Sequence, residues 1–172
     1  MKRIGLLSDT HSCWDDRDEK YFGECDEIWH AGDIGSYSVA QRLNEIAMLR
    51  AVHGNCDGAD IRSRYDEIHR FKVEEAEVLM KHIGGTPGHY DARARQLLMT
   101  DTPKLFVCGH SHILKVQFDN VLNMLYINPG AAGLQGWQKE RTLVRFTVNG
   151  DTFSNLEVIE LKADRSHIEI LD

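Results

Sequence analysis

The chain has 172 residues and a formal net charge of -7, from 20 lysine and arginine residues against 27 aspartate and glutamate residues. This length can bury a sufficient core without disulfides, so we expect a single domain over residues 1–172. The acidic balance opposes attraction to nucleic acid or to a membrane surface, so we expect neither as a high-affinity partner. The start of the chain lacks a signal-peptide pattern and the four cysteines form no CxxC pair, which indicates a cytoplasmic protein with reduced thiols.

Short apolar runs that end at polar or glycine residues predict buried strands. In the first two thirds of the chain these runs are Lys2–Leu7, Glu27–His30, Met48–Val52, Val78–Lys81 and Leu105–Cys108. Apolar residues at helical spacing predict helices over Ser38–Ile46, with Ser36 or Ser38 as its N-cap, and over Asp91–Met99. Alternating strands and helices are typical of parallel α/β sheets, in which ligands gather at the carboxyl ends of the strands.

Beyond residue 112 the pattern changes to strands separated by short turns, which is typical of antiparallel pairing. The predicted strands are Lys115–Phe118, Met124–Ile127, Leu143–Val148 and Leu156–Leu161. Asn149-Gly150 is the strongest hairpin signal in the chain. Because no linker marks the change of pattern, we predict two sheets that share one core. The tail, residues 163–172, carries no structural signal.

Residue types that bind metals follow the predicted strands at five places. Asp9 with His11, and His110 with His112, stand at alternate positions, and alternate residues of extended backbone point to the same side. Two aspartates, one asparagine and four histidines exceed the needs of one ion, so we predict two ions that share a bridging carboxylate. The predicted ligands are Asp9, His11, Asp33, Asn55, His82, His110 and His112.

The donor types suggest both the metal and the reaction. Imidazole with carboxylate suits Mn, Ni, Co, Zn or Fe better than Mg or Ca, and we expect Mn first. Two divalent cations, two aspartates and a bridging hydroxide leave a charge of about +1, which attracts phosphate. Such a pair lowers the pKa of the bridging water and orients it for in-line attack on a phosphate ester. The sequence has neither a GxSxG elbow nor a P-loop, which disfavours serine hydrolases and nucleoside triphosphatases.

Taken in order, the polar motifs closely resemble the signature of the calcineurin-like metallophosphoesterases. They are Asp9-x-His11, Gly32-Asp33, Gly54-Asn55-x-Asp57, His82 and Gly109-His110-x-His112. The later Asn128-Pro129-Gly130 resembles a turn found in the small single-domain prokaryotic phosphodiesterase branch. The resemblance implies a four-layer α/β/β/α sandwich with two mixed sheets and a dinuclear metal site at the carboxyl ends of the strands.

Carried over to matching positions, the resemblance also implies roles for individual side chains. Asp33 lies between the two metals and Asp57 orients a neighbouring imidazole, while His11 or His110 assists charge stabilisation or proton transfer. The resemblance divides the remaining ligands into two sets, one for each metal: Asp9, His11 and His112, and Asn55, His82 and His110.

Cys56 departs from the pattern of many phosphomonoesterases in the superfamily, which carry a histidine there that protonates the leaving group. A neutral thiol is a poor acid for an alkoxide, so we expect dependence on good leaving groups, on metal activation or on another donor such as His53 or His89. As a nucleophile Cys56 lacks a paired base, and the plainer expectation is a small buried loop residue. The interposed Ile83 is a second departure, but His82 remains the expected ligand because it ends an apolar strand.

Other conspicuous side chains have structural interpretations. His30 and His53 are expected to pack beside the ligands, and His89, in a glycine-proline loop, is expected to line the substrate pocket. The three tryptophans are expected to be packing residues, although two of them could edge the pocket: Trp14, Trp29 and Trp137, the first and last being the candidates for the edge.

These observations predict a metal-dependent phosphodiesterase that acts on a small phosphorylated substrate, and a homo-oligomer stays open as an expectation. The residues expected to act in catalysis are Asp33, Asn55, His110, Cys56 and Asp57. Two alternatives stay open. A retromer subunit of similar fold serves as a protein-interaction module, so the chain could be a metal-binding scaffold with little turnover. A nuclease acting on short nucleic acids is the third possibility.

Overall fold

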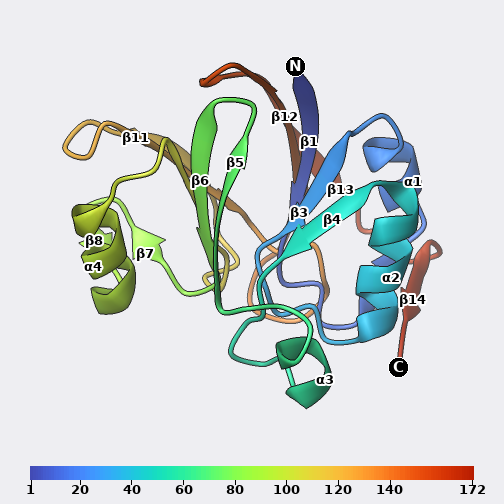
Figure 1. Ribbon diagram of the computed structural model, residues 1–172. Coiled ribbons are helices and arrows are strands. Elements are labelled where there is room, and N and C mark those ends of the chain that lie inside the picture. Colours follow the sequence, from blue (N-terminus) through green and yellow to red (C-terminus); the bar gives the residue numbers. More distant parts are fainter.

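Two five-stranded mixed sheets face each other at the centre of the protein, whose computed structural model describes residues 1–172 (Figure 1). In the first sheet, two parallel pairs, β1 with β3 and β3 with β4, continue into the antiparallel strands β12 and β13. The order across this sheet is β13 (Thr152–Leu161), β12 (Arg141–Asn149), β1 (Lys2–Leu7), β3 (Glu27–His30) and β4 (Met48–Ala51).

The second sheet is also mixed, but it has parallel strands at its centre and an antiparallel strand at each edge. Strands β6, β9 and β11 run parallel, and β5 and β10 pair antiparallel to their neighbours. The order is β10 (Leu114–Asp119), β11 (Met124–Pro129), β9 (Leu105–Val107), β6 (Ala76–Lys81) and β5 (Ile68–Val73). The predicted strands are therefore present, but those beyond residue 112 form two hairpins that belong to different sheets.

Apolar side chains from the facing surfaces of both sheets form the central core. Trp29 of the first sheet packs edge-on against Phe71 of the second, with ring centroids 4.9 Å apart, and both belong to a continuous buried cluster. Alternation along each strand directs these side chains inward, and their burial holds the two sheets together.

Helices cover the outer faces of both sheets and complete a four-layer α/β/β/α arrangement, as predicted (Figure 1). The first sheet is covered by α1 (Arg17–Phe22) and α2 (Tyr37–Ile46), and the second by α4 (Ala92–Thr100). The side chain of Ser36 accepts the N–H of Ser38 and caps α2, so the first of the two proposed caps is correct. Asp91 caps α4 in the same way.

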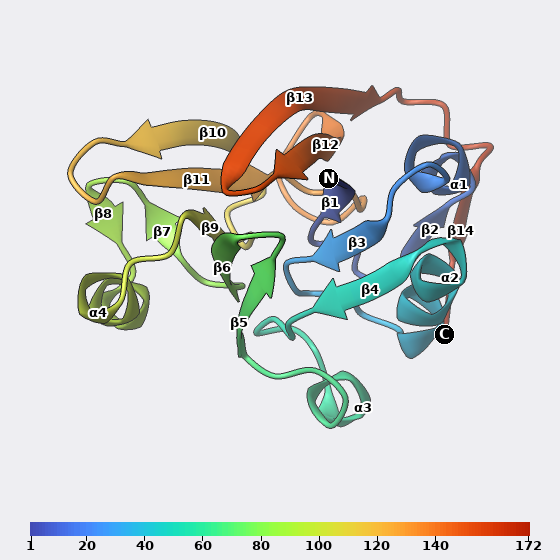
Figure 2. The same ribbon diagram turned by 45° about the horizontal axis from the view of Figure 1, so that its top comes forward.

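Smaller elements lie at the edges of the sandwich (Figure 2). The tail, whose residues carry no structural signal of their own, contains a strand that pairs antiparallel with a short strand that follows His11. These elements are β2 (Cys13–Asp15), α3 (Ala59–Arg62), β7 (Gly85–Thr86), β8 (His89–Tyr90) and β14 (Ile168–Ile170). No helix is both long and apolar enough to cross a membrane.

Asp18 of α1 is a buried carboxylate whose Oδ1 has no hydrogen-bond partner. Burial, reinforced by the charge of Asp15, raises its pKa to about 8. The folded protein therefore holds a proton that the unfolded chain releases near pH 4, and stability is lost as pH rises from about 4 to 8. We expect Asp18→Asn to raise the thermal midpoint at pH 9 and to change it little at pH 5.

The same thermal unfolding series for Glu19→Gln provides the control, because Glu19 is an exposed carboxylate on the same helix. A stabilisation by Asp18→Asn of equal size at pH 5 and pH 9 would contradict the assignment of a raised pKa.

Candidate metal centre

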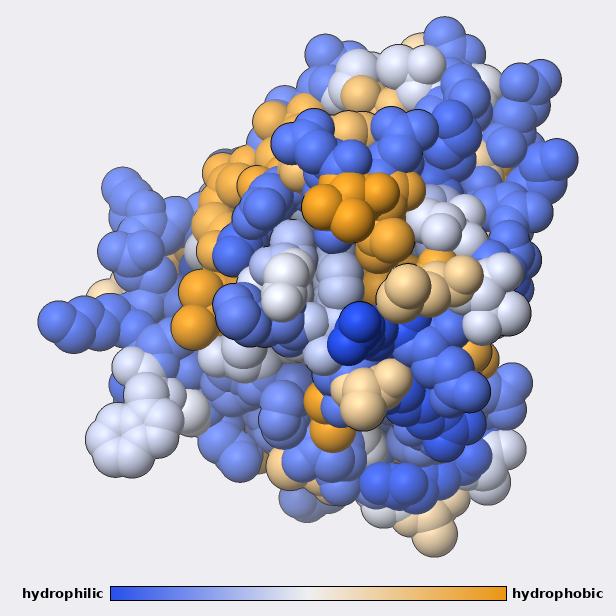
Figure 3. All heavy atoms as spheres, turned by 90° about the vertical axis from the view of Figure 1, so that its left-hand side faces the viewer, coloured by the Kyte–Doolittle hydropathy of each residue, from blue (hydrophilic) through white to orange (hydrophobic).

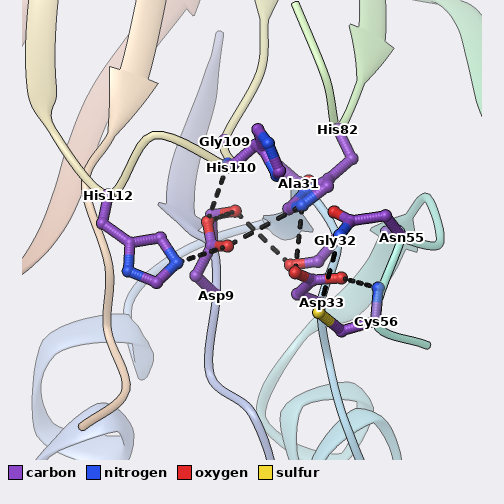
Figure 4. Close-up of polar contacts among 12 residues, drawn as sticks. Asp9, Ala31, Gly32, Asp33, Asn55, Cys56, His82, Gly109, His110 and His112 are labelled. Carbon is purple, nitrogen blue, oxygen red and sulfur yellow. Dashed lines mark hydrogen bonds and ion pairs between the residues drawn. The ribbon is translucent and has the colours of Figure 1, made fainter. Parts of the chain in front are cut away.

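Five loops that carry the predicted ligands meet between the two sheets at one end of the sandwich. They follow the carboxyl ends of β1, β3 and β4 in the first sheet and of β6 and β9 in the second. Parallel strands end at the same edge of a sheet, so ligands distant in sequence converge there. Figure 4 shows the side chains directed toward a common centre.

One cluster of donor atoms consists of Asp9, His11 and His112, whose potential ligand atoms all lie within 4.8 Å of one another. Oδ1 of Asp9 is 3.1 Å from Nε2 of His112 and 3.8 Å from Nε2 of His11. The other carboxylate oxygen of Asp9 is held by the Ser8 hydroxyl at 2.6 Å and by the backbone N–H of His110 at 3.1 Å. These two contacts leave Oδ1 free to face the imidazoles.

The second cluster consists of Asp33, His82 and His110, again with donor atoms within 4.8 Å of one another. Oδ2 of Asp33 lies 3.1 Å from Nε2 of His82 and 3.7 Å from Nε2 of His11 in the first cluster. Asp33 thus stands between the two clusters, the position expected of a bridging carboxylate. Asn55 lines a cleft together with His82 (Figure 4).

The backbone of the ligand loops is strained. Nine residues other than glycine have positive φ, and five of these are predicted ligands. Residues that have a Cβ rarely adopt a positive φ, and residues held at a positive φ concentrate at functional sites. The five ligands are Asp9, His11, Asp33, His110 and His112.

The unsatisfied atoms of the site fit bound cations. Three buried side-chain atoms lack a hydrogen-bond partner here: Oδ1 of Asp9 and the Nε2 atoms of His11 and His82. Nδ1 of His82 lies 2.7 Å from the carbonyl of Ala31 and must donate to it, so Nε2 carries the lone pair when the ring is neutral. Buried polar atoms without partners are costly, and a divalent cation would satisfy these three together.

Electrostatics keep two of the donors, Asp33 and His110, in the states that metals require. Burial raises the pKa of Asp33, but contacts with His82 and with the backbone N–H of Cys56 outweigh it and hold the pKa well below its usual range. Burial and the neighbouring His82 lower the pKa of His110. Near pH 7 the carboxylate is therefore ionised and the His110 ring is neutral, as ligation demands.

His30, expected to pack beside the ligands, does so. Its Nε2 lies 2.9 Å from the Thr10 hydroxyl, which itself donates to the carbonyl of Ile34, so the ring donates through Nε2. Its Nδ1 accepts the N–H of Gly32. Burial lowers the pKa of this histidine to about 3, which keeps it neutral. His30 thereby links the loops after β1 and β3.

Asp57 differs from its expected role, because it contacts backbone amides and not an imidazole. Its carboxylate accepts the N–H groups of Ile34 at 3.2 Å, Gly35 at 2.8 Å and Gly54 at 2.8 Å. A carboxylate can accept several such bonds at once, whereas a ring N–H would use only one. Asp57 therefore fixes the loop of Asp33 against the loop of Asn55.

The structure corrects three further expectations about how exposed a side chain is or where it lies. Cys56 is exposed, with its sulfur in a group with His11 and Asp33, rather than buried in its loop. Trp137 is fully exposed and packs against nothing, whereas the other two tryptophans are buried. His89 lies in β8 and lines a separate hollow beside α4, so it is remote from the metal-side cleft.

The structure reveals two supporting residues that the sequence did not single out. Oε1 of Gln138 accepts from Nδ1 of His112 at 2.9 Å, which directs Nε2 of that ring toward Asp9. Asn128 donates to the carbonyl of Gly109 at 2.9 Å and to the hydroxyl of Ser111 at 3.0 Å, so it holds the loop between the two histidine ligands. The Asn-Pro-Gly turn was the only available signal for Asn128, and Gln138 had none.

We expect Gln138→Ala to weaken metal binding by about tenfold, because removal of a partner that orients a ligating histidine typically costs 10–100-fold. The affinity is measured by competition with a fluorescent chelator. Gln135→Ala is the matched control, because it is in the same loop and its backbone carbonyl, not its side chain, contacts Gln138. Equal affinities for both variants would mean that the contact with His112 does not orient the ring.

Comparison with known proteins agrees with the geometry. The family model of the calcineurin-like phosphoesterase superfamily domain matches residues 1–151. This match covers most of the chain, and the strands and loops of the site lie within it. The protein therefore belongs to the calcineurin-like phosphoesterase superfamily.

Solved structures share the fold. Vps29 from Chaetomium thermophilum has a TM-score of 0.77 at 15% identity, covering 98% of this chain and 96% of its own. An archaeal phosphodiesterase has a TM-score of 0.70 at 21% identity, covering 92% and 99%. Vps29 from Entamoeba histolytica, in complex with zinc, has a TM-score of 0.72 at 13% identity, covering 92% and 98%. No protein of curated function matches the sequence.

Proposed function

We propose that the protein is a metal-dependent phosphodiesterase with two divalent metal ions. The supporting observation is the group of buried, unpartnered donor atoms shared by Asp9, His11 and His82, next to the Asp33 carboxylate. Two bound cations would activate water for attack on phosphorus and stabilise charge on the phosphoryl oxygens. The imidazole and carboxylate donors favour Mn²⁺, with Ni²⁺, Co²⁺, Zn²⁺ and Fe²⁺ as alternatives.

The residues of the chain divide the work of holding the ions and the substrate. Asp9, His11 and His112 would hold one ion and Asn55, His82 and His110 the other, with Asp33 between them. The ring of His110 is partly exposed at the mouth of the site, where it can also contact a phosphoryl oxygen. The site would attract a phosphate only when the charge of the bound cations outweighs the negative charge of the carboxylates.

The expectation of good leaving groups rests on the absence of a strong acid beside the leaving group. Burial, followed by the neighbouring Asp33 carboxylate, raises the pKa of the Cys56 thiol, so Cys56 stays neutral and donates a proton poorly. His53 is not available in its place, because Nδ1 donates to the carbonyl of Tyr65 and Nε2 accepts from Arg62. Esters with good leaving groups are therefore the expected substrates.

All four cysteines are free thiols, which supports a reducing compartment such as the cytoplasm. The substrate expected there is a small phosphorylated molecule, because the site opens on a cleft of limited volume and the chain as a whole is acidic.

The proposal is tested by substituting Asn55 with alanine and measuring hydrolysis of bis(p-nitrophenyl) phosphate with added Mn²⁺. Asn55 is partly outside the packed core, so its loss leaves the fold intact while removing a neutral oxygen donor. We expect hydrolysis to fall by about a hundredfold. Asn44→Ala, in α2 away from the site, is the control. Unchanged hydrolysis in Asn55→Ala would contradict the assigned role.

A scaffold function is the second candidate, favoured by exposed apolar side chains on one face. Val116 and Phe118 alternate on the edge strand β10, and Ile113 and Val121 lie at its two ends. Figure 3 shows apolar groups gathered on the face that carries α4 and the β10–β11 turn. The Asn55→Ala variant separates the two functions, because a scaffold would keep its partner when this metal ligand is lost.

A further inference from the structure

A cleft of about 240 Å³ opens directly beside the metal centre. Its wall includes the ligands Asn55 and His82, so a phosphoryl group held at the metal centre would have its organic substituent next to this cleft. The remaining lining residues are His53, Gly54, Arg62, Glu67, Lys81 and Ile83. Two of these carry a positive charge and one carries a negative charge.

Arg62 is a cation without an acidic partner. Its Nε donates to the carbonyl of Asp57 at 2.6 Å, and NH2 lies 3.2 Å and 3.3 Å from the carbonyls of Gly54 and Asn55. NH1 makes one contact, with Nε2 of His53 at 3.3 Å. No carboxylate forms an ion pair with this guanidinium, and one of its five N–H groups has no partner in these contacts. The charge is fixed in position but not neutralised.

Lys81 supplies a second positive charge that is nearly buried. Its side chain is 5% exposed, and Nζ donates to the carbonyl of Ile83 at 2.8 Å. The nearest carboxylates, of Glu67 and Asp91, are each 3.8 Å from Nζ, which is longer than a direct charge-assisted hydrogen bond. Glu67 is itself half exposed, so its charge is partly screened by solvent.

The guanidinium of Arg62 is the charge of the cleft that has no acidic partner, whereas Lys81 faces Glu67 and Asp91 at 3.8 Å. An unpaired cation stands out in a chain whose charge is -7 overall. A fixed guanidinium in a concave site is a preferred partner for phosphate and carboxylate groups, because its N–H groups match their geometry.

We propose that this cleft binds a second anionic group, carried on the organic substituent of the substrate. The preferred substrate is then a phosphodiester that bears a further phosphate or carboxylate, and Arg62 is the residue that selects it. This inference rests on the proposed phosphodiesterase function for the position of the first phosphate. The selection of a substrate with a second anionic group depends only on the charged side chains of the cleft.

A matched pair of chromogenic diesters tests the proposal by turnover. The pair is thymidine 5′-(p-nitrophenyl phosphate) and the same molecule with an added 3′-phosphate. We expect kcat/KM of the metal-loaded protein to be about tenfold higher for the phosphorylated diester, in line with one charge-assisted contact. The ratio should approach one in Arg62→Gln, and should be largely kept in Arg62→Lys. The ratio cancels any general loss caused by a displaced Asn55 loop.

Equilibrium binding provides a readout that needs no turnover. Calorimetry compares thymidine 3′,5′-bisphosphate with thymidine 5′-monophosphate, and we expect the same tenfold preference, reduced by Arg62→Gln and by added salt. Arg64→Gln is the control, because Arg64 pairs with Asp60 and stacks on Tyr37 outside the cleft. That variant should keep the preference.

The outcomes distinguish this inference from the function on which it rests. Hydrolysis of both diesters at equal rates, with equal affinities for the two nucleotides, overturns the second anionic site and leaves the phosphodiesterase intact. Absence of hydrolysis with a retained preference for the bisphosphate refutes the proposed function while the cleft still binds a second anion. If the Arg62→Gln variant keeps the preference for the bisphosphate, another residue selects the second anion and the role proposed for Arg62 is overturned.

Discussion

Replacing Asp33 with asparagine should reduce diester hydrolysis by about a thousandfold and lower the metal content of the purified protein. Asp33 lies within 4 Å of an imidazole in each cluster, through His11 and His82, and it belongs to a group of close donor atoms with each of them. An amide has nearly the same shape and can still accept the N–H of Cys56, which Asp33 accepts at 2.8 Å. The variant therefore removes a negative charge from the centre of the site with little change in its packing.

Metal content by elemental analysis and initial rates with added Mn²⁺ check this expectation together. Asp101→Asn is the matched control, because its carboxylate is exposed and pairs only with Arg70 at the surface. A variant at Asp33 that retains both full metal content and full activity would show that the carboxylate does not bridge the two clusters.

Removal of the Asp57 carboxylate should have the largest effect on stability. In Asp57→Ala the backbone N–H groups of Ile34, Gly35 and Gly54 lose their acceptor, and the site is nearly inaccessible to water. Unsatisfied buried donors cost about 1–3 kcal/mol each, so we expect a loss of about 3 kcal/mol or more. For a chain of this size the thermal midpoint should fall by about 10 °C.

Metal affinity should fall in the same variant, because Asp57 joins the loops that carry Asp33 and Asn55. Asp60→Ala is the control for both measurements: this aspartate is three residues away, exposed, and pairs with Arg64 at the surface. Its removal should cost less than about 0.5 kcal/mol. If the two variants unfold at the same temperature, the backbone contacts of Asp57 do not secure the site.

Much of the fold and of the site was predictable from local pattern. The buried strands β1, β3 and β6 are each followed by a ligand within three residues. Parallel strands present their carboxyl ends to one edge of a sheet. Hence the ordered positions of Asp9 and His82 predicted their proximity in space. The N-cap at Ser36 was also predictable from local sequence, because a cap depends on only two nearby residues.

What the sequence did not reveal depends on contacts between distant segments. Strand β14 is stabilised by pairing with β2, more than 150 positions earlier in the chain, so its own residues carry no periodic signal. Gln138 acts on His112 only because the intervening hairpin of β10 and β11 returns the chain to the site. The partners of Asp57 are backbone amides, which every sequence contains, and so no pattern of side chains predicts them.

The most direct test of the central claim is hydrolysis of a chromogenic phosphodiester, beside its monoester, by metal-stripped protein resupplied separately with Mn²⁺, Ni²⁺, Co²⁺, Zn²⁺ and Mg²⁺. We predict that the stripped protein is inactive, that Mn²⁺ or another of the borderline ions restores diester hydrolysis, and that Asp33→Asn stays inactive under every condition. Metal binding without hydrolysis of either ester would contradict the phosphodiesterase function and favour the scaffold.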